Sequence, residues 1–429
     1  MENTLAVILA GGRGERLSVL AQERTKPAIP FAGKYRIIDF TLSNCVNSGV
    51  SKVAVLTQYQ PLSLVDHLGV GAPWGLAAPG RAIRLLQPFL SPEEHRNWYK
   101  GTADAVFQNL QYIERQKAEH VLILSGDHVY KMDYSLMLNF HNDNQADVTL
   151  AYTRIPEADL SQFGTVSVDD KGQVTSFEEK VKHPKSNLIS MGVYLFKKDV
   201  LLRRLEEDAR LRSSKHDFGH DVLPRVMKKQ RLFGYEFQGY WRDVGTVQTY
   251  WQTNMDLIHM SPGGYLSEAD WPIRTNDEER SPAIVSESAR VIDSLVSNGC
   301  LIEGHVEHSI LSPGVIISEG AVVKDSIILS DSTVGSHSII DCTILDKEVV
   351  VEAGCHIGFG DDMRVNRKEP KVLNTGITLV GKWAKIPPGT RIGHNCIIYC
   401  GVVEEDFRSD EIPSGQTVSP RKRRSVRTH

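Results

Sequence analysis

Cysteine is scarce in this sequence, and no two cysteines form a CxxC pair. Zinc sites and disulfide frameworks depend on such spacing, so the sequence favours neither. A reducing compartment, the cytoplasm, is therefore the expected location. The six cysteines are Cys45, Cys300, Cys342, Cys355, Cys396 and Cys400.

Long apolar runs and strong positive charge are also missing. No run approaches the ~20 apolar residues that a membrane-spanning helix needs, and no basic leader with a cleavage site follows Met1. The formal net charge of −4 gives no electrostatic reason to expect nucleic acid or a membrane as a partner. One basic run, Arg421–Arg424, is a candidate patch, although a solvated chain end is the commoner explanation.

What the sequence does contain, over its first 255 residues, is an alternation of short apolar runs and amphipathic stretches. Strands are predicted over 5–10, 52–57 and 120–125, and a helix over 103–116. Strands that are apolar on both faces and separated by helices predict an α/β fold with a Rossmann-like, mainly parallel sheet. Ligands bind such sheets at the carboxyl ends of the strands, where Gly11-Gly12 and Gly126-Asp127 stand.

From about residue 290 the apolar residues recur every six positions. This spacing predicts the triangular coils of a left-handed parallel β-helix, with an antiparallel sandwich as the alternative. The register slips at Asp346, a segment from Gly360 to about Lys382 interrupts it, and Ile386, Ile392 and Ile398 resume it. The uninterrupted run consists of Ile310, Ile316, Val322, Ile328, Val334 and Ile340.

These patterns divide the chain of 429 residues into two domains, as its length leads us to expect. The predicted boundaries are a catalytic α/β domain over 1–255, a linker over 256–290 and a β-helix domain with a basic tail over 291–429. A solenoid leaves a flat face and two open ends, which commonly associate with copies of themselves. A homo-oligomer is therefore expected.

A glycine–arginine loop, Gly11-Gly12-Arg13-Gly14-Glu15-Arg16, follows the first strand and is predicted to open a helix. Glycine lets backbone N–H groups approach phosphate oxygens closely. The loop is neither a Walker A sequence nor the dinucleotide fingerprint. Arg13, Arg16 and Lys26 would place three cations near a triphosphate, which suits a reaction that expels pyrophosphate.

Two acidic motifs, Ser125-Gly126-Asp127-His128 and Trp241-Arg242-Asp243, each follow an apolar stretch. Two carboxylates from distant segments could hold Mg²⁺ at the reacting phosphates. The alternative for each aspartate is a turn or helix-cap role. His128 is expected to be a packing neighbour rather than a metal ligand.

Two further motifs are candidate substrate contacts. Glu179 and Lys180 follow a predicted hairpin turn and could bind sugar hydroxyls and phosphate, although a surface ion pair is the simpler explanation. The run Trp98–Ala103 combines aromatic rings with a small-residue turn and could contact a base or sugar. A hydrophobic staple on the following helix is its alternative.

Together these motifs resemble the sugar-nucleotide pyrophosphorylase superfamily and, within it, the bacterial glucose-1-phosphate adenylyltransferases. The resemblance covers nearly the whole chain, and NWYKGTADA and YRIIDFTLSNCVNSG are typical of the adenylyl-transferring branch. The motifs are LAGGRGERL (9–17), KPAIPFAGKYRIIDFTLSNCVNSG (26–49), TQYQ (57–60), NWYKGTADAV (97–106), SGDHVYKMDY (125–134), FGTV (163–166), FEEK (177–180), SMGVYLF (190–196), HDFGHDVLP (216–224) and YWRDVGT (240–246).

The resemblance implies a role for each matching position. Asp127 and Asp243 are implied as Mg²⁺ ligands, with Asp127, Arg13 and Lys26 as the catalytic residues. The implied phosphate contacts are Gly11, Gly12, Arg13, Gly14, Arg16 and Lys26. The implied adenine contacts are Gln58, Gly101, Thr102 and Ala103. The implied glucose 1-phosphate contacts are Tyr99, Gly164, Glu179, Lys180 and Ser190.

The implied reaction is direct attack of glucose 1-phosphate on the α-phosphorus of ATP, which gives ADP-glucose, the glucosyl donor for glycogen. No covalent enzyme intermediate is needed, so the protein contributes positioning and charge stabilisation. The family also implies a homotetramer and allosteric control.

The sequence departs from regulated enteric members at the segment before Lys26-Pro27. Those members carry a lysine there that binds a sugar-bisphosphate activator, whereas this chain has Glu23, and a second basic position is Pro30. Arg24 and Arg36 remain. Because an anion at position 23 repels a bisphosphate, we expect a different effector or a weaker response.

Three other functions compete with this interpretation. A UTP- or dTTP-using nucleotidyltransferase would share most of the motifs. A regulatory subunit without activity typically loses the arginines or aspartates that are present here. A hexapeptide acyltransferase would use a histidine such as His337 or His356, but it leaves the N-terminal half unexplained.

Overall fold

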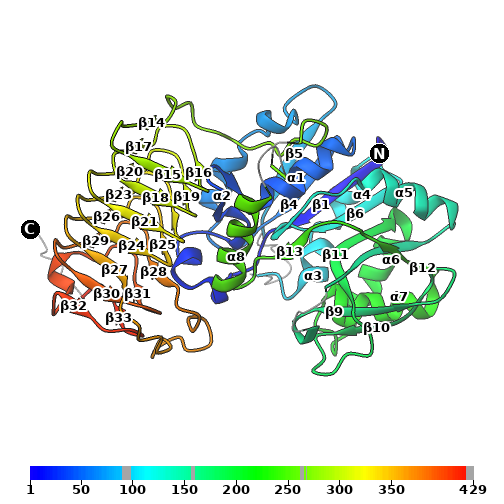
Figure 1. The fold of residues 1–429 in the computed structure, drawn as a ribbon. Helices are drawn as coiled ribbons and strands as arrows, with labels where there is room; N and C mark the ends of the chain where they lie inside the picture. Colours follow the sequence, from blue (N-terminus) through cyan, green and yellow to red (C-terminus); the bar gives the residue numbers. More distant parts are fainter. Residues whose placement is uncertain (89–97, 156–159, 261–264, 267, 422–429) are drawn as a thin grey trace, which may run out of the picture. The chain divides into compact units, whose positions relative to one another are not determined.

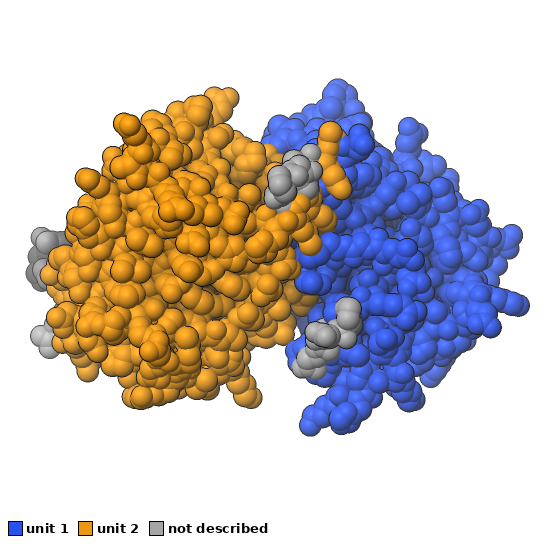
Figure 2. All heavy atoms as spheres, in the orientation of Figure 1, with its two compact units in different colours: residues 1–12, 37–242, 270–274 blue, residues 13–36, 243–269, 275–429 orange. Residues whose placement is uncertain are grey.

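The computed structural model describes residues 1–88, 98–155, 160–260, 265–266 and 268–421. Over these residues the chain folds into two compact units, coloured separately in Figure 2. Unit 1 comprises residues 1–12, 37–242 and 270–274, and unit 2 comprises 13–36, 243–269 and 275–429. The predicted domain boundaries divide the chain differently and stay a prediction. Asn97 and residues 422–424 of the predicted basic run lie outside the described residues.

Unit 1 is built on a nine-stranded sheet in which the order is β10-β9-β11-β6-β1-β4-β5, with β8 paired to β11 and β12 paired to β8 (Figure 1). Strands β6, β1, β4 and β5 run parallel, while β11 runs antiparallel to β6 and β8. The sheet is thus mainly parallel at its centre, as predicted. The strands are β1 (Thr4–Leu9), β4 (Lys52–Leu56), β5 (Ala82–Leu86), β6 (His120–Ser125), β8 (Val148–Arg154), β9 (Gly164–Val168), β10 (Val174–Glu179), β11 (Leu188–Lys197) and β12 (Leu232–Glu236).

The three strands expected from apolar runs are confirmed, but the single helix expected over 103–116 is wrong. It forms two short helices that break at Asn109, whose backbone has φ −107° and ψ 14°. The Asn109 side chain donates to the carbonyl of Ala105 and to the Tyr99 hydroxyl. Asparagine side chains that bond to the backbone compete with helix continuation. The helices of the unit are α1 (Ile37–Asn47), α2 (Leu62–Leu68), α3 (Thr102–Phe107), α4 (Leu110–Arg115), α5 (Tyr134–Asp143), α6 (Lys198–Ala209), α7 (Leu223–Lys229) and the shorter η3 (Ala72–Trp74), η4 (Leu160–Gln162) and η5 (Phe218–Val222).

A small two-stranded sheet completes the part of unit 1 near the predicted acidic motifs. It pairs β7 (His128–Tyr130) with β13 (Trp241–Asp243), whose first two residues belong to this unit. The strand β7 begins one residue after Asp127, which follows β6 at the carboxyl end of the sheet.

Unit 2 contains a parallel β-helix whose coils stack from β14 to β33 (Figure 1). Its strands form three parallel sheets, the architecture expected of a left-handed β-helix. The first sheet contains β14 (Ile284–Val285), β17 (Leu301–Ile302), β20 (Ile316–Ile317), β23 (Thr333–Val334), β26 (Val350–Val351) and β29 (Lys385–Ile386). The second contains β15 (Arg290–Ile292), β18 (His305–Glu307), β21 (Val322–Lys324), β24 (Ile339–Asp341), β27 (His356–Phe359), β30 (Arg391–Gly393) and β32 (Glu411–Ile412). The third contains β16 (Leu295–Val296), β19 (Ile310–Leu311), β22 (Ile327–Ile328), β25 (Thr343–Leu345), β28 (Thr378–Val380), β31 (Ile397–Ile398) and β33 (Thr417–Val418).

The strict spacing of six predicted for the coils is wrong in detail. Strand registers place Leu311 against Ile328 and Ile328 against Leu345, so each of these coils holds 17 residues and one of its three sides is a residue short. Counting by six therefore shifts by one residue in each coil. Ile316 is 37% exposed because the core residue of its strand is Ile317, whereas the later members Ile328, Val334 and Ile340 are fully buried. Where the pattern slips at Asp346, the core residue is instead Leu345, which is fully buried.

The interruption of the coils is also shorter than predicted. The strand β28 begins at Thr378, so the inserted segment occupies 360–377 rather than 360–382. The buried ring of His394 joins the ends of this segment, with Nε2 2.8 Å from the carbonyl oxygen of Gly360 and Nδ1 3.0 Å from that of Gly376.

The N-terminal segment 13–36 belongs to unit 2 because it packs against α8 (Val247–His259). The Tyr250 hydroxyl donates to the carbonyl of Pro30 at 2.6 Å, and the Asn254 side chain accepts from the N–H of Ala32 at 2.8 Å. The indole of Trp251 donates to the carbonyl of Asp325 in a coil turn. The segment contains η1 (Glu15–Ala21), η2 (Lys26–Ala28), β2 (Pro30–Phe31) and β3 (Tyr35–Arg36).

A buried ion pair ties the same segment directly to the β-helix. The guanidinium of Arg24 donates to both carboxylate oxygens of Asp346, at 2.8 and 3.1 Å, and the two side chains are 4% and 1% exposed. The N–H of Lys347 donates to the same carboxylate at 2.7 Å. Asp346 is therefore a coil-turn residue that faces Arg24, which explains why it interrupts the apolar pattern.

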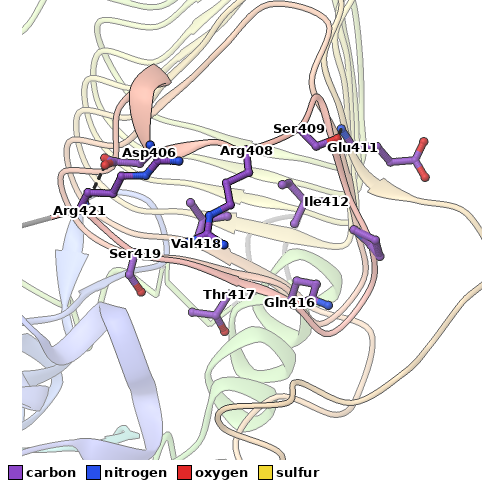
Figure 3. Close-up of a pocket in the computed structure, with 11 residues that line it drawn as sticks. Asp406, Arg408, Ser409, Glu411, Ile412, Gln416, Thr417, Val418, Ser419 and Arg421 are labelled. Atoms are coloured by element: carbon purple, nitrogen blue, oxygen red, sulfur yellow. Dashed lines mark hydrogen bonds between the residues drawn. The ribbon is translucent and has the colours of Figure 1, made fainter.

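The last coil of the β-helix is hollowed into a groove (Figure 3). No residue of the predicted substrate sites lines it. The carboxylate of Asp406 accepts from the N–H of Arg421 at 2.9 Å beside the groove. Its lining residues include Arg408, Ile412, Thr417, Val418 and Arg421.

All six cysteines are free thiols. Among the described residues, none of the helices combines the length and the apolar character that crossing a membrane would require.

The Arg24–Asp346 pair predicts a large, asymmetric effect on stability. Asp346→Asn removes the anion opposite a buried guanidinium, which typically costs ~3–5 kcal/mol. The thermal unfolding midpoint should fall by about 5 °C or more, and less in the double variant Arg24→Met/Asp346→Leu. The exposed pair Lys34–Asp277, at 2.9 Å in the same unit, is the control, and Asp277→Asn should cost at most ~1 kcal/mol. Equal midpoints for Asp346→Asn and Asp277→Asn would contradict this prediction.

His141 predicts a loss of stability in mild acid. Burial lowers the pKa of this α5 side chain to about 4, with a smaller effect from neighbouring His120. The unfolded chain takes up that proton near pH ~6.5, so stability falls as the pH drops from about 6.5 towards 4. His141→Gln should therefore show a smaller drop in unfolding midpoint between neutral pH and pH ~5 than the unsubstituted protein. Exposed His183→Gln should not change that drop; an identical drop in all three proteins would refute the assignment.

Candidate active site

In unit 2, three predicted residues gather around the glycine of the WRDVGT motif. Lys26 Nζ donates to Asp243 Oδ1 at 2.6 Å, and the two side chains are 8% and 18% exposed. A Cβ placed on Gly245 would lie 2.8 Å from Arg16 Nη2 and 2.9 Å from Asp243 Oδ2. A side chain at this position would therefore crowd a guanidinium and a carboxylate. The unit assembles two cations and one acid at a single point.

The glycine–arginine loop reaches this point without the helix that the sequence predicts. The segment after Gly14 is the 3₁₀ helix η1, interrupted at Ser18, where φ is 50°. Gly14 itself has φ 67°, and a Cβ there would lie 3.2 Å from Cβ of Lys26. Both the positive φ and the contact require glycine. Arg13 is 60% exposed and lies 3.5 Å from the carboxylate of Glu15.

In unit 1, Gly11, Gln58 and Tyr99 are neighbours. The side chain of Gln58 accepts from the N–H of Tyr99 at 2.9 Å, and a Cβ on Gly11 would lie 3.5 Å from Gln58 Cγ. A Cβ on Gly12 would meet nothing within 4 Å. Packing therefore gives no reason for glycine at position 12, in keeping with a backbone left open for a ligand. Beside them, the ring of Trp98 stacks on Tyr59 with centroids 4.9 Å apart.

The turn at Gly101 and Thr102 opens helix α3. A Cβ on Gly101 would lie 2.3 Å from the carbonyl oxygen of His216, so no larger residue fits. The Thr102 hydroxyl donates to Asp217 Oδ2 at 2.8 Å and accepts from the N–H of Phe218 at 3.0 Å. This turn is fixed by the segment that precedes η5 rather than by residues of its own helix.

Glu179 lies at the end of β10 between two glycines. A Cβ on Gly164 would lie 2.6 Å from Glu179 Oε2, and one on Gly219 would lie 2.3 Å from the same atom. Burial raises the pKa of Glu179, the adjacent Lys180 opposes this, and the Asp217 carboxylate adds to it. The Lys180 side chain is 60% exposed, and its Nζ lies 3.4 Å from Glu179 Oε1.

Ser190 lies on β11 next to this pair of strands. It is 9% exposed, and its hydroxyl is 3.4 Å from the hydroxyl of Tyr194. Backbone pairing of Ile189 with Thr165 sets β11 beside β9, the strand that begins at Gly164. Gly164, Glu179 and Ser190 are therefore contributed by three strands of one antiparallel region.

Asp127 follows β6 at the carboxyl end of the parallel strands. Its carboxylate accepts from the hydroxyl of Ser125, and its side chain is 29% exposed. His128 packs edge-on against the Trp241 ring, with centroids 4.9 Å apart, and its Nε2 lies 3.5 Å from Asp127 Oδ1. The ring contact agrees with the expected packing role of His128.

The predicted residues thus fall into groups that each unit assembles by itself. Unit 1 brings Gly11 and Gln58 to Tyr99, and unit 2 brings Arg16 and Lys26 to Asp243. Sequence reasoning missed the supporting residues Ser125, Asp217 and Gly245, although each stands inside a motif that it quoted. Ser125 and Gly245 carry no charge, and the Asp217 carboxylate accepts hydrogen bonds from its own segment and from Thr102, so these three support the site through hydrogen bonds and close packing.

The sequence is similar to family models and to curated proteins along nearly its whole length. The model of the family described as nucleotidyl transferase matches residues 5–259, and that of the GlmU-like, C-terminal hexapeptide family matches residues 282–380. A protein of Thermomicrobium roseum named glucose-1-phosphate adenylyltransferase is 51% identical over 98% of this chain and 98% of its own. Proteins with the same name from Acetivibrio thermocellus and Thermotoga neapolitana are 45% and 43% identical over 96% and 98% of this chain, and over 97% and 100% of their own. Because the first family match spans more than half of the sequence and these relatives align along nearly all of it, the chain belongs to the nucleotidyl transferase family.

Proposed function

We propose that this protein catalyses the reaction of ATP with α-D-glucose 1-phosphate to give ADP-glucose and pyrophosphate. The observation that carries the proposal is the assembly of Lys26, Arg16 and Asp243 around Gly245, with Lys26 2.6 Å from Asp243. Two cations beside one carboxylate suit a triphosphate whose leaving pyrophosphate gains charge. The shared name of the relatives supports glucose 1-phosphate and the adenylyl group as substrates.

The proposed chemistry is a single in-line displacement. A phosphate oxygen of glucose 1-phosphate forms a bond to the α-phosphorus of ATP, and the bond from that phosphorus to the bridging α–β oxygen breaks. The electron pair leaves with pyrophosphate, and no proton has to be transferred. Because little covalent chemistry falls to the protein, its contribution is positioning and stabilisation of charge.

We assign the nucleotide to the glycine–arginine loop and the Gln58–Tyr99 region. Backbone N–H groups of Gly11, Gly12 and Gly14 would bind phosphate oxygens, as backbone turns rich in glycine commonly do. Arg13, Arg16 and Lys26 would neutralise the β- and γ-phosphates. Gln58, Gly101 and Thr102 would contact adenine.

We assign the sugar phosphate to the strands β9, β10 and β11. Glu179, buried between Gly164 and Gly219, would accept hydrogen bonds from glucose hydroxyls, while the exposed ammonium of Lys180 would bind the phosphate. Ser190 and Tyr99 would complete the site. A carboxylate suits this role because a buried acceptor with charge forms strong hydrogen bonds to hydroxyls.

The metal in this proposal is Mg²⁺, with Asp127 and Asp243 as its protein ligands. Both offer carboxylate oxygens, which Mg²⁺ prefers together with water and substrate phosphates. Asp127 is partly exposed and fixed by the Ser125 hydroxyl, and Asp243 is balanced by Lys26, so each carboxylate is already oriented within its own unit. When bound, the ion would stabilise the negative charge of the phosphates.

Asp127→Asn tests the catalytic assignment together with a panel of nucleotides. ATP should support sugar-nucleotide synthesis from glucose 1-phosphate far better than UTP or dTTP, and the variant should lose ~10²–10³-fold in kcat, the usual loss when one charge-stabilising group is removed. Asp169→Asn, in the β9–β10 turn of the same unit, should keep normal turnover. A preference for UTP would refute the nucleotide assignment, and near-normal turnover of Asp127→Asn would refute the metal assignment.

Regulation is proposed to differ from that of members activated by a sugar bisphosphate. Glu23 and Pro30 replace two basic positions, and Arg24 has both of its terminal nitrogens bonded to buried Asp346. Fructose 1,6-bisphosphate should therefore change the rate of ADP-glucose synthesis little, which an assay with and without it measures. Glu23→Lys should increase the response, since it replaces repulsion by attraction. Strong activation of the unsubstituted protein by micromolar fructose 1,6-bisphosphate would contradict this proposal.

The cellular setting belongs to the same proposal. ADP-glucose made here would serve as the glucosyl donor for glycogen in the cytoplasm, and the enzyme would act as a homotetramer under allosteric control. The β-helix supports self-association because solenoid faces and ends commonly pair with copies of themselves.

A further inference from the structure

The last coil of the β-helix ends in two strands that each have a free edge. Among the strands that the structure describes, β32 pairs only with β30, and β33 pairs only with β31. In this solenoid the N–H groups of one coil donate to carbonyls of the next, as Arg391 does to Asp410 at 2.7 Å and Ile397 to Gln416 at 3.0 Å. No described coil follows the last one. The outer edges of β32 and β33 therefore present backbone groups with which an added strand could pair.

Two arginines line the groove on this last coil. Arg408 and Arg421 are both exposed, and Figure 3 shows the side chain of Arg408 crossing the groove toward Val418. The hydrogen bond of Arg421 to Asp406 comes from its backbone N–H, at 2.9 Å. Within the described part of the chain, neither guanidinium forms an ion pair. Two positive charges of the groove are therefore available to an anionic ligand.

The carboxylates beside these arginines are bonded to other groups. Asp406 Oδ2 accepts from the N–H of Val403 at 3.0 Å, and its Oδ1 accepts from the N–H of Arg421. The carboxylate of Glu411 lies 3.7 Å from Nη1 of Arg391, in the preceding coil. Each acid thus already offsets another donor, so the positive charge of the groove remains.

The groove also has an apolar floor. Ile412 and Val418 line it, and Ile412 is 8% exposed. Side chains of an extended segment alternate between two directions, so a strand paired to this edge could set apolar residues over the floor and acidic ones near the arginines. A single small anion would use the guanidiniums but leave the strand edges unpaired. The combination of charge, free edge and apolar floor favours an extended acidic peptide.

Charge argues against occupants from this chain itself. The same end of a second copy would bring the two guanidiniums against identical ones, which is repulsive. The first coil of a second copy presents Ile284 and Val285, which are apolar and 62% and 52% exposed. The next three residues of the sequence, Lys422-Arg423-Arg424, are also basic. None of these segments supplies the anions that suit the groove.

We propose that the groove of the last coil binds an acidic, extended segment of another protein, which adds a strand to β32 or β33. In complexes of this kind backbone pairing supplies affinity, and contacts with alternate side chains supply specificity. The two arginines would bind carboxylates of the segment through charge-assisted hydrogen bonds. Because the groove is lined only by residues between 406 and 421, the proposal does not depend on the reaction assigned to the enzyme.

The proposal is tested with the full-length protein and a fluorescein-labelled peptide of about eight alternating glutamate and valine residues, whose Kd is measured by fluorescence anisotropy. Arg408→Gln/Arg421→Gln should raise this Kd about tenfold, since it removes both charge-assisted contacts. The matched control is Arg290→Gln/Lys324→Gln, which removes the same charge from exposed positions of other coils. It should leave the Kd unchanged. An equal rise in both double variants, or no binding to the unsubstituted protein, would overturn the proposal.

A second peptide separates strand addition from simple attraction between charges. When its alternate amide nitrogens are methylated, the peptide keeps its charge but cannot pair with a strand edge, so its Kd should also rise about tenfold. Equal binding of both peptides, with displacement by millimolar inorganic phosphate, would show a small-anion site and contradict strand addition. A change in oligomeric state of Arg408→Gln/Arg421→Gln, measured by light scattering, would show an interface between copies and would contradict it equally.

Discussion

The buried ion pair between Arg24 and Asp346 is the constraint on which the arrangement of unit 2 depends. Burying two charges is costly unless they are paired with good geometry, and here both carboxylate oxygens are bonded to one guanidinium. The pair fixes the N-terminal segment, at a point two residues before Lys26, to a turn of the β-helix. Because Lys26 in turn holds Asp243, the position of the proposed phosphate contacts is set by the solenoid as well as by the loop that carries them.

Glycines define the site by what they allow to approach. Gly245 admits Arg16 beside Asp243, while Gly164 and Gly219 enclose the carboxylate of Glu179. In each case a single Cβ would collide with a charged group. Glycine at these points serves close packing of charge and backbone, whereas at Gly12 the space remains open. A glycine-rich loop usually suggests open space for a ligand, and of these glycines only Gly12 has it.

The fold could be predicted largely from the sequence because apolar runs and the hexapeptide spacing are strong local signals. The apolar runs at 5–10, 52–57 and 120–125 predicted the strands that form at 4–9, 52–56 and 120–125. The coil length of 17 did not, since a repeat of six is correct for two sides and fails at the third. At the break, the Asn109 side chain donates to the Ala105 carbonyl and to the Tyr99 hydroxyl, and no local pattern encodes the second bond, to a residue ten positions away.

The charged residues of the site could be predicted because they stand in recognisable motifs. Their partners could not, because contacts with distant residues determine those roles. Asp127, Lys26 and Glu179 stand in motifs whose chemistry suggests phosphate, metal or sugar. Asp346 and Asp217 are aspartates of equally ordinary appearance, and their roles come from partners 322 and 115 residues away. Contacts of such sequence separation become visible only in the folded chain.

We propose above all that one in-line displacement at the α-phosphorus of ATP forms the product. The most direct measurement is the stereochemical course of the reaction with a single diastereomer of adenosine 5′-O-(1-thiotriphosphate) and glucose 1-phosphate. One displacement predicts inversion of configuration at the α-phosphorus in the thio-substituted ADP-glucose. Retention of configuration would require a covalent intermediate on the protein and would contradict the account.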